Sequence, residues 1–172
     1  VLTVSKAETG QLAFAPSPVN LVALCEALID GCNVSDDRHH PVEFRHRGPC
    51  DGSDDVCLEL DARLLRQILA NLLSNAMKYS EAGSPIEFEV DCNADRVVFQ
   101  IRDRGIGIPL EDQKHLFESF HRGKNVGNIQ GTGLGLSIVK KSVDLHNGDI
   151  KIDSEEGEGT TVTVTIPLRQ ER

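Results

Sequence analysis

The spacing of hydrophobic and polar positions predicts a chain of mixed helices and strands. Apolar residues recur at helical intervals over residues 21–29, and again over a longer segment through Tyr79 that begins after Asp61, a typical N-cap residue. Residues 86–91 alternate between apolar and acidic side chains, which is the pattern of a strand with one solvated face. The other expected elements are strands over residues 42–45, 56–60, 97–102, 150–153 and 160–166, and a helix over residues 134–146.

The order of these elements predicts an α+β fold. Two antiparallel hairpins and the lack of a repeated βαβ unit favour a two-layer sandwich, in which a mixed, mostly antiparallel sheet packs on about three helices. Residues 1–16 look like the end of a helix followed by a linker, because Pro16 and Pro18 break the helical pattern. We therefore expect one globular domain over residues 17–172.

Composition limits the classes of partner. The 172 residues are 39% hydrophobic and 26% charged, with a formal net charge of −9, which argues against a nucleic acid or an anionic membrane as partner. No apolar run is long enough to span a bilayer, and no signal peptide is visible. The five cysteines lack CxxC spacing, so we expect reduced thiols in a cytoplasmic protein. The missing initiator methionine suggests a fragment of a longer protein.

Two glycine-rich turns are the strongest chemical signal. Asp103-Arg-Gly-Ile-Gly-Ile-Pro109 places a carboxylate at a strand end before one turn, and Gly131-Thr-Gly-Leu-Gly-Leu-Ser137 opens a helix. A carboxylate can read a purine, whereas glycine lets backbone N–H groups approach phosphates that a Cβ atom would exclude. The two turns together predict a nucleotide site. A dinucleotide fold is disfavoured, because neither turn lies in the strand–turn–helix unit with a downstream acid.

The predicted helix between Asp61 and Tyr79 carries a second chemical signal. Asn71, Asn75 and Lys78 fall within roughly 60° of one another on a face that is not the apolar one. Asparagine is a poor helix former, so two of them in mid-helix suggest that their amides have a role. An amide oxygen suits Mg²⁺, and a neighbouring lysine suits a phosphate. Taken alone, a solvated polar stripe is an equally good interpretation; the glycine turns favour function.

In order and spacing, four segments resemble the N, G1, F and G2 boxes of sensor histidine kinases: Asn71–Asn75, Asp103–Gly107, Leu116–Phe120 and Gly131–Leu136. The resemblance covers roughly residues 17–168. It implies the Bergerat ATP-binding fold of the GHKL superfamily, which also includes gyrase and chaperone ATPases. The first residues similarly look like the tail of the dimerisation helix that precedes this domain in such kinases.

The resemblance implies a role for each matching residue. Asp103 would accept a hydrogen bond from the adenine amino group, Asn75 and Asn71 would hold Mg²⁺, and Lys78 would contact the phosphates. Residues 121–132 would form a lid, from which Arg122 and Lys124 reach the γ-phosphate. Asn71, Lys78 and Arg122 would be the catalytic residues. The rest of the ATP site would be Tyr79, Gly105, Gly107, Ile108, Phe120, Gly131, Thr132, Gly133, Leu134, Gly135, Leu136 and Thr160.

The residue at position 71 separates the possible activities. Hydrolytic members of the superfamily have a glutamate there as general base for water, and asparagine cannot take that proton. Transfer to a histidine of a dimerisation domain is therefore expected, with a response regulator receiver domain as the next partner. None of the six histidines here is followed by an acid, as the family's acceptor is. A GHKL serine kinase of the anti-sigma type and a non-catalytic nucleotide-sensing module remain alternatives.

Overall fold

The computed structural model describes residues 14–35, 39–48, 58–93, 95–117 and 135–168. A five-stranded sheet forms one layer, in the order β2-β4-β5-β7-β6. Its strands are β2 (Val42–Arg47), β4 (Ile86–Cys92), β5 (Arg96–Asp103), β6 (Asp149–Glu155) and β7 (Gly159–Pro167). Only the β2–β4 pair is parallel within this sheet.

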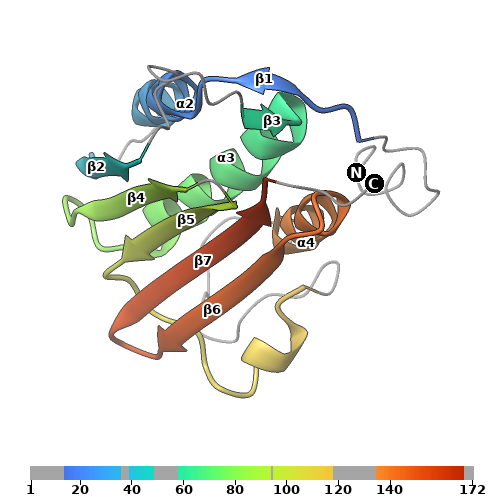
Figure 1. Cartoon of the computed structure of the whole chain (residues 1–172). Coiled ribbons are helices and arrows are strands. Elements are labelled where there is room, and N and C mark those ends of the chain that lie inside the picture. The colour runs from blue at the N-terminus through green and yellow to red at the C-terminus, as the bar shows by residue number, and fades with distance from the viewer. Residues whose placement is uncertain (1–13, 36–38, 49–57, 94, 118–134, 169–172) are drawn as a thin grey trace.

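The second layer consists of helices on one face of this sheet (Figure 1). They are α2 (Leu21–Ser35), α3 (Ala62–Tyr79) and α4 (Gly135–Leu145). The short strands β1 (Ser17–Val19) and β3 (Leu58–Leu60) pair separately, and a 3₁₀ turn, η1, spans Gln113–His115. This architecture confirms the predicted α+β sandwich. No described helix is long and apolar enough to cross a membrane.

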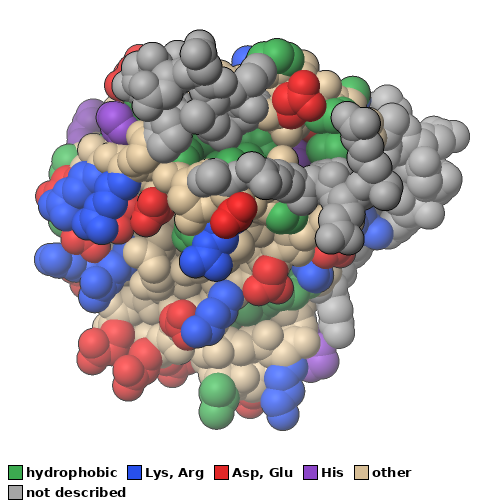
Figure 2. Space-filling view, in the orientation of Figure 1, with side chains coloured by type: hydrophobic (Ala, Val, Ile, Leu, Met, Phe, Trp, Pro, Cys, Tyr) green, Lys and Arg blue, Asp and Glu red, His purple; other side chains and the backbone are tan. Residues whose placement is uncertain are grey.

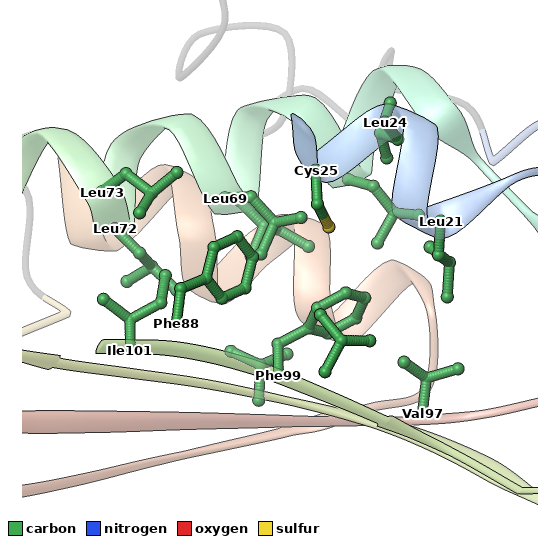
Figure 3. Packing of buried hydrophobic residues seen from close by; sticks show 14 of the residues in the cluster. Leu21, Leu24, Cys25, Leu69, Leu72, Leu73, Phe88, Val97, Phe99 and Ile101 are labelled. Atoms are coloured by element: carbon green, nitrogen blue, oxygen red, sulfur yellow. The ribbon is translucent and has the colours of Figure 1, made fainter. Parts of the chain in front are cut away.

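The core lies between α3 and the middle strands. Alternate residues of β4 and β5 point at the helices, so that Phe88 and Phe99 meet Leu69 and Leu72 of α3 (Figure 3). Both phenylalanines are at most 1% exposed. Burying one such side chain contributes about 1.5–3 kcal/mol, so the two phenylalanines alone stabilise the sheet–helix contact by several kcal/mol. Cys25 of α2 lies in the same core, and burial raises the pKa of its thiol to about 12.

The other face of the sheet carries ion pairs between exposed side chains. Arg45 lies 3.7 Å from Glu89, and Arg102 lies 3.8 Å from Glu87. Figure 2 shows acidic and basic side chains interspersed over the side of the molecule that it draws. Exposed pairs of this kind add little stability, so their effect is mainly to keep this face solvated.

A buried polar link joins the start of α3 to the end of α4. Asp61 caps α3 as predicted, accepting the N–H groups of Arg63 and Leu64 at 3.0 and 3.2 Å. Its own N–H donates to Nε2 of the fully buried His146 at 3.2 Å, while Nδ1 of that ring lies 3.0 Å from the carbonyl of Ser142. The ring is therefore neutral with its proton on Nδ1, and burial lowers the pKa of His146.

The prediction of reduced cysteines is wrong for Cys92, which is disulfide-bonded, whereas Cys25 and Cys32 are free. Parallel pairing of β2 with β4 brings Gly48 against the end of β4, where a Cβ atom on Gly48 would lie 1.9 Å from the Cys92 carbonyl oxygen. Cysteine spacing carries no information on this long-range pairing.

Candidate functional site

Asp103 is the last residue of β5 and continues the helix-facing alternation of Phe99 and Ile101. Its Oδ1 accepts the N–H of Gly105 at 3.0 Å. Burial raises the pKa of Asp103 to about 6, and three influences oppose that rise: the backbone N–H groups of Gly105 and Thr160 and the nearby His40. The site thus holds a carboxylate that is ionised at pH 7 and is ready to accept a further hydrogen bond.

The first glycine turn is docked against α3. Gly105 lies so close that a Cβ atom there would be 2.3 Å from the carbonyl oxygen of Tyr79. The same carbonyl accepts the N–H of Ile106 at 3.0 Å. Glycine at position 105 is therefore needed for close approach, and the turn fixes Asp103 beside the last turn of α3.

The turn is also docked against the β6–β7 hairpin. Gly107 has φ +69°, and a Cβ atom there would lie 2.0 Å from the carbonyl oxygen of Glu155. Gly157 donates its N–H to the carbonyl of Ile106 at 2.7 Å, and Ile108 donates its N–H to Oγ of Ser154 at 2.9 Å. The turn is thus held on both sides, by the helix and by the hairpin.

Thr160 lies directly opposite Asp103 in the β5–β7 pair. Directly paired residues of antiparallel strands share a face, so Thr160 lies beside Asp103; that the two line one adenine pocket stays a prediction. Sequence reasoning missed two neighbours of this pair. Ser154 Oγ lies 2.8 Å from Thr160 Oγ1, and Gln113 Nε2 donates to the carbonyls of Ile108 and Ser154 at 2.9 and 3.1 Å. The sequence does hold a sign of Ser154: it continues the alternation of Ile150 and Ile152, and so lies on the helix-facing side of β6.

The two asparagines of α3 lie one turn apart, and both are half-buried. Asn71 Nδ2 donates to the Gln67 carbonyl at 2.7 Å, which leaves its Oδ1 turned away from that carbonyl and able to act as a ligand. The described residues give the Asn75 amide no hydrogen bond. Lys78 is exposed and Tyr79 half-buried at the end of the helix that meets Gly105. The amides fit a cation that is also held by ligand oxygens.

No group of three or more His, Cys, Asp or Glu side chains in the described part of the chain is arranged to hold a metal.

The second glycine turn lies largely outside the described residues. Phe120, Arg122, Lys124, Gly131, Thr132, Gly133 and Leu134 belong to residues 118–134, so their assigned roles stay predictions. Gly135 is the first residue of α4, and Leu136 packs partly buried against the core. The prediction that a helix opens behind the second turn is confirmed. The structure brings together Asp103, the first turn, the end of α3 and the hairpin residue Thr160.

Comparison with known proteins points to one family, that of the histidine kinase ATPase domains. Residues 60–170 match the family model described as Histidine kinase-, DNA gyrase B-, and HSP90-like ATPase. The chain is 35% identical over 176 residues to the sensor histidine kinase WalK of Bacillus subtilis, covering 100% of this chain and 28% of that protein. It is 47% identical over 109 residues to the circadian input-output histidine kinase CikA of Synechococcus elongatus, covering 62% of this chain and 14% of that protein.

Two solved structures share the fold. The Acinetobacter baumannii histidine kinase AdeS superposes with a TM-score of 0.76 at 24% identity, covering 98% of this chain and 75% of that one. Full-length ShkA in complex with AMPPNP superposes with a TM-score of 0.79 at 23% identity, covering 99% of this chain and 35% of that one. Two of the curated relatives match nearly all of this chain. The chain spans only about a quarter of the length of each of them, 28% of one and 23% of the other.

Proposed function

This chain belongs to the histidine kinase-, DNA gyrase B- and HSP90-like ATPase family, as an ATP-binding domain of the histidine kinase type, and we propose that it transfers the γ-phosphoryl group of ATP to a histidine of a dimerisation domain. The observation that carries this proposal is the position of Asp103. Its half-buried carboxylate lies where α3, the first glycine turn and the β6–β7 hairpin meet.

The purine would be read at this point. An ionised carboxylate accepts hydrogen bonds and donates none, so Asp103 would bind the exocyclic amino group of adenine and repel the carbonyl oxygen of guanine. Gly105 and Gly107 hold the turn in place, and Ile108, Thr160 and Tyr79 would surround the base. The pKa of about 6 keeps Asp103 ionised at neutral pH despite its burial.

The phosphates would extend from the base along α3. A helix rises about 1.5 Å per residue, so Asn71 lies roughly 12 Å along the axis from Tyr79, which suits an elongated nucleotide. Asn75 and Asn71 would hold Mg²⁺, which when bound neutralises phosphate charge. Lys78 would contact a phosphate, and the N-terminus of α4 would direct its positive dipole to the same anion. Arg122 of the predicted lid would reach the γ-phosphate.

The polar face of α3 supports transfer to a side chain over hydrolysis. Asn71 stands where a hydrolytic enzyme needs a general base, and its amide has no proton to exchange at neutral pH. An imidazole is already nucleophilic at neutral pH, so a histidine acceptor needs little help from a base. None of the six histidines of this chain is followed by an acidic residue, as the family's acceptor histidine is, which favours an acceptor on another domain. A receiver domain would then take the phosphoryl group in the cytoplasm.

Labelling of a supplied acceptor tests this proposal and separates it from its alternatives. The chain is incubated with ATP labelled at the γ-phosphate and the dimerisation domain of a related sensor kinase. We expect label on that domain that is lost in acid and kept in alkali, as phosphohistidine requires. Acid-stable label would favour a serine kinase, release of free phosphate alone would indicate an ATPase, and ATP binding with neither would favour a nucleotide-sensing module.

A further inference from the structure

Three side chains form a row across the end of the sheet. Asp103 of β5 is paired with Thr160 of β7, which is paired in turn with Ser154 of β6. Paired residues of antiparallel strands share a face, and all three continue the helix-facing alternation of their strands. Ser154 therefore lies next to the residue that neighbours Asp103, although it is one strand removed from the carboxylate.

The hydroxyl of Ser154 has three partners. Its Oγ accepts the N–H of Ile108 at 2.9 Å, lies 3.0 Å from the carbonyl oxygen of Gly159 and lies 2.8 Å from Oγ1 of Thr160. A hydroxyl has one proton and two lone pairs. Since a carbonyl oxygen only accepts, the Ser154 proton goes to Gly159, and the Thr160 hydroxyl donates to the remaining lone pair of Ser154. This is the one arrangement that satisfies all three contacts.

This arrangement fixes the chemistry of Thr160. Its single proton is used within the row, so only lone pairs of Oγ1 are left for a ligand. Beside it, the Asp103 carboxylate also offers only lone pairs. Two adjacent acceptors match an amino group, which carries two N–H bonds, and they repel a carbonyl oxygen in the same place.

We propose that Ser154 is a positioning residue that determines specificity: by taking the Thr160 proton, it makes the pocket select a 6-amino purine over a 6-oxo purine. This inference rests on the proposed ATP site. When the Ser154 hydroxyl is absent, Thr160 can rotate and donate its proton to a 6-oxo group. The turn also loses the partner of the Ile108 N–H, so overall nucleotide affinity falls as well.

Calorimetric titration with ATP and inosine triphosphate tests the role, because these nucleotides differ at purine position 6. We expect Ser154→Ala to narrow the ratio of the two affinities roughly three- to tenfold, the effect of one hydrogen bond. Ser154→Thr retains the hydroxyl and should retain the ratio. Thr163→Ala, on the opposite face of β7, is the matched control and should leave the ratio unchanged.

A double-mutant cycle shows whether Ser154 acts through Thr160. Thr160→Val removes the neighbouring hydroxyl with little change in shape, and Ser154→Ala in that background should not alter the ratio further. A residue that only stabilised the hairpin would weaken both nucleotides equally, and that result would overturn the inference.

Circular dichroism establishes that each variant is folded. If Ser154→Ala is unfolded, an unchanged ratio in Thr160→Val overturns the inference on its own. If the parent chain binds neither nucleotide, the proposed function fails, and the inference fails with it.

Discussion

Replacement of Asp103 by asparagine should make the protein more stable at neutral pH while abolishing adenine recognition. The side chains are nearly isosteric, and the asparagine oxygen can still accept the Gly105 N–H that the carboxylate accepts at 3.0 Å. What the variant loses is the charge. In the folded protein that charge is unfavourable, because burial outweighs the hydrogen bonds that Asp103 receives.

The magnitude follows from the pKa of Asp103, which is about 6 in the folded protein against an ordinary value of 3.8. Each pKa unit corresponds to about 1.36 kcal/mol, so ionisation of Asp103 destabilises the folded state by roughly 3 kcal/mol. Because the pKa of Asp103 is raised in the folded protein, the stabilisation that comes from its protonation is fully present below pH 3.8. This stabilisation is lost as the pH rises through about 6. Between pH 4.5 and pH 8 the variant should gain about 2 kcal/mol relative to the parent chain.

Urea denaturation of both proteins at a series of pH values measures this difference directly. All other titrating groups are shared, so their contributions cancel in the comparison. The difference in unfolding free energy, variant minus parent, should rise from pH 4.5 to about pH 6.5 and then stay constant. A difference that is independent of pH, or a variant that is less stable than the parent chain at high pH, would refute the claim that ionisation of Asp103 destabilises the folded protein.

Three further substitutions test other parts of the account. Asn75→Ala should remove the Mg²⁺-dependent gain in ATP affinity, and equal calorimetric losses with and without Mg²⁺ would exclude a ligand role. Because the pKa of His146 is lowered, the parent chain should lose stability relative to His146→Gln as the pH drops below 6.5, by at most about 1.4 kcal/mol per pH unit; a difference between the two urea titrations that does not change with pH would refute this. Gly107→Ala should lower the free energy of unfolding by more than about 2 kcal/mol, because backbone strain adds to a clash with the Glu155 carbonyl. Gly83→Ala, also at positive φ but in open space, is the control and should lower it by about 1 kcal/mol, both measured by thermal unfolding.

Local patterns predicted the elements that depend on neighbouring residues. The alternation in β4 and β5 identified the helix-facing side, and Asp61 was correctly predicted as the N-cap of α3. The same alternation placed Asp103 at a strand end facing the helices. Periodicity and capping chemistry were sufficient here, because these features are set within a few residues.

Contacts between segments far apart in the chain could not be predicted from the sequence. Parallel pairing of β2 with β4 depends on segments some 40 residues apart, and the spacing of the cysteines did not reveal that Cys92 is disulfide-bonded. Ser154 was missed for the same reason: its contacts with Ile108 and Thr160 arise only when the glycine turn docks on the hairpin. A single sequence gives the residue types but not which hydroxyl meets which turn.

Calorimetric titration of ATP and GTP into this chain, each with and without Mg²⁺, tests the central claim most directly. The account predicts that ATP binds, that Mg²⁺ tightens its binding, and that GTP binds much more weakly because Asp103 repels its carbonyl oxygen. Equal affinity for the two nucleotides, or no binding of ATP, would contradict the claim that Asp103 and the first glycine turn form an adenine site.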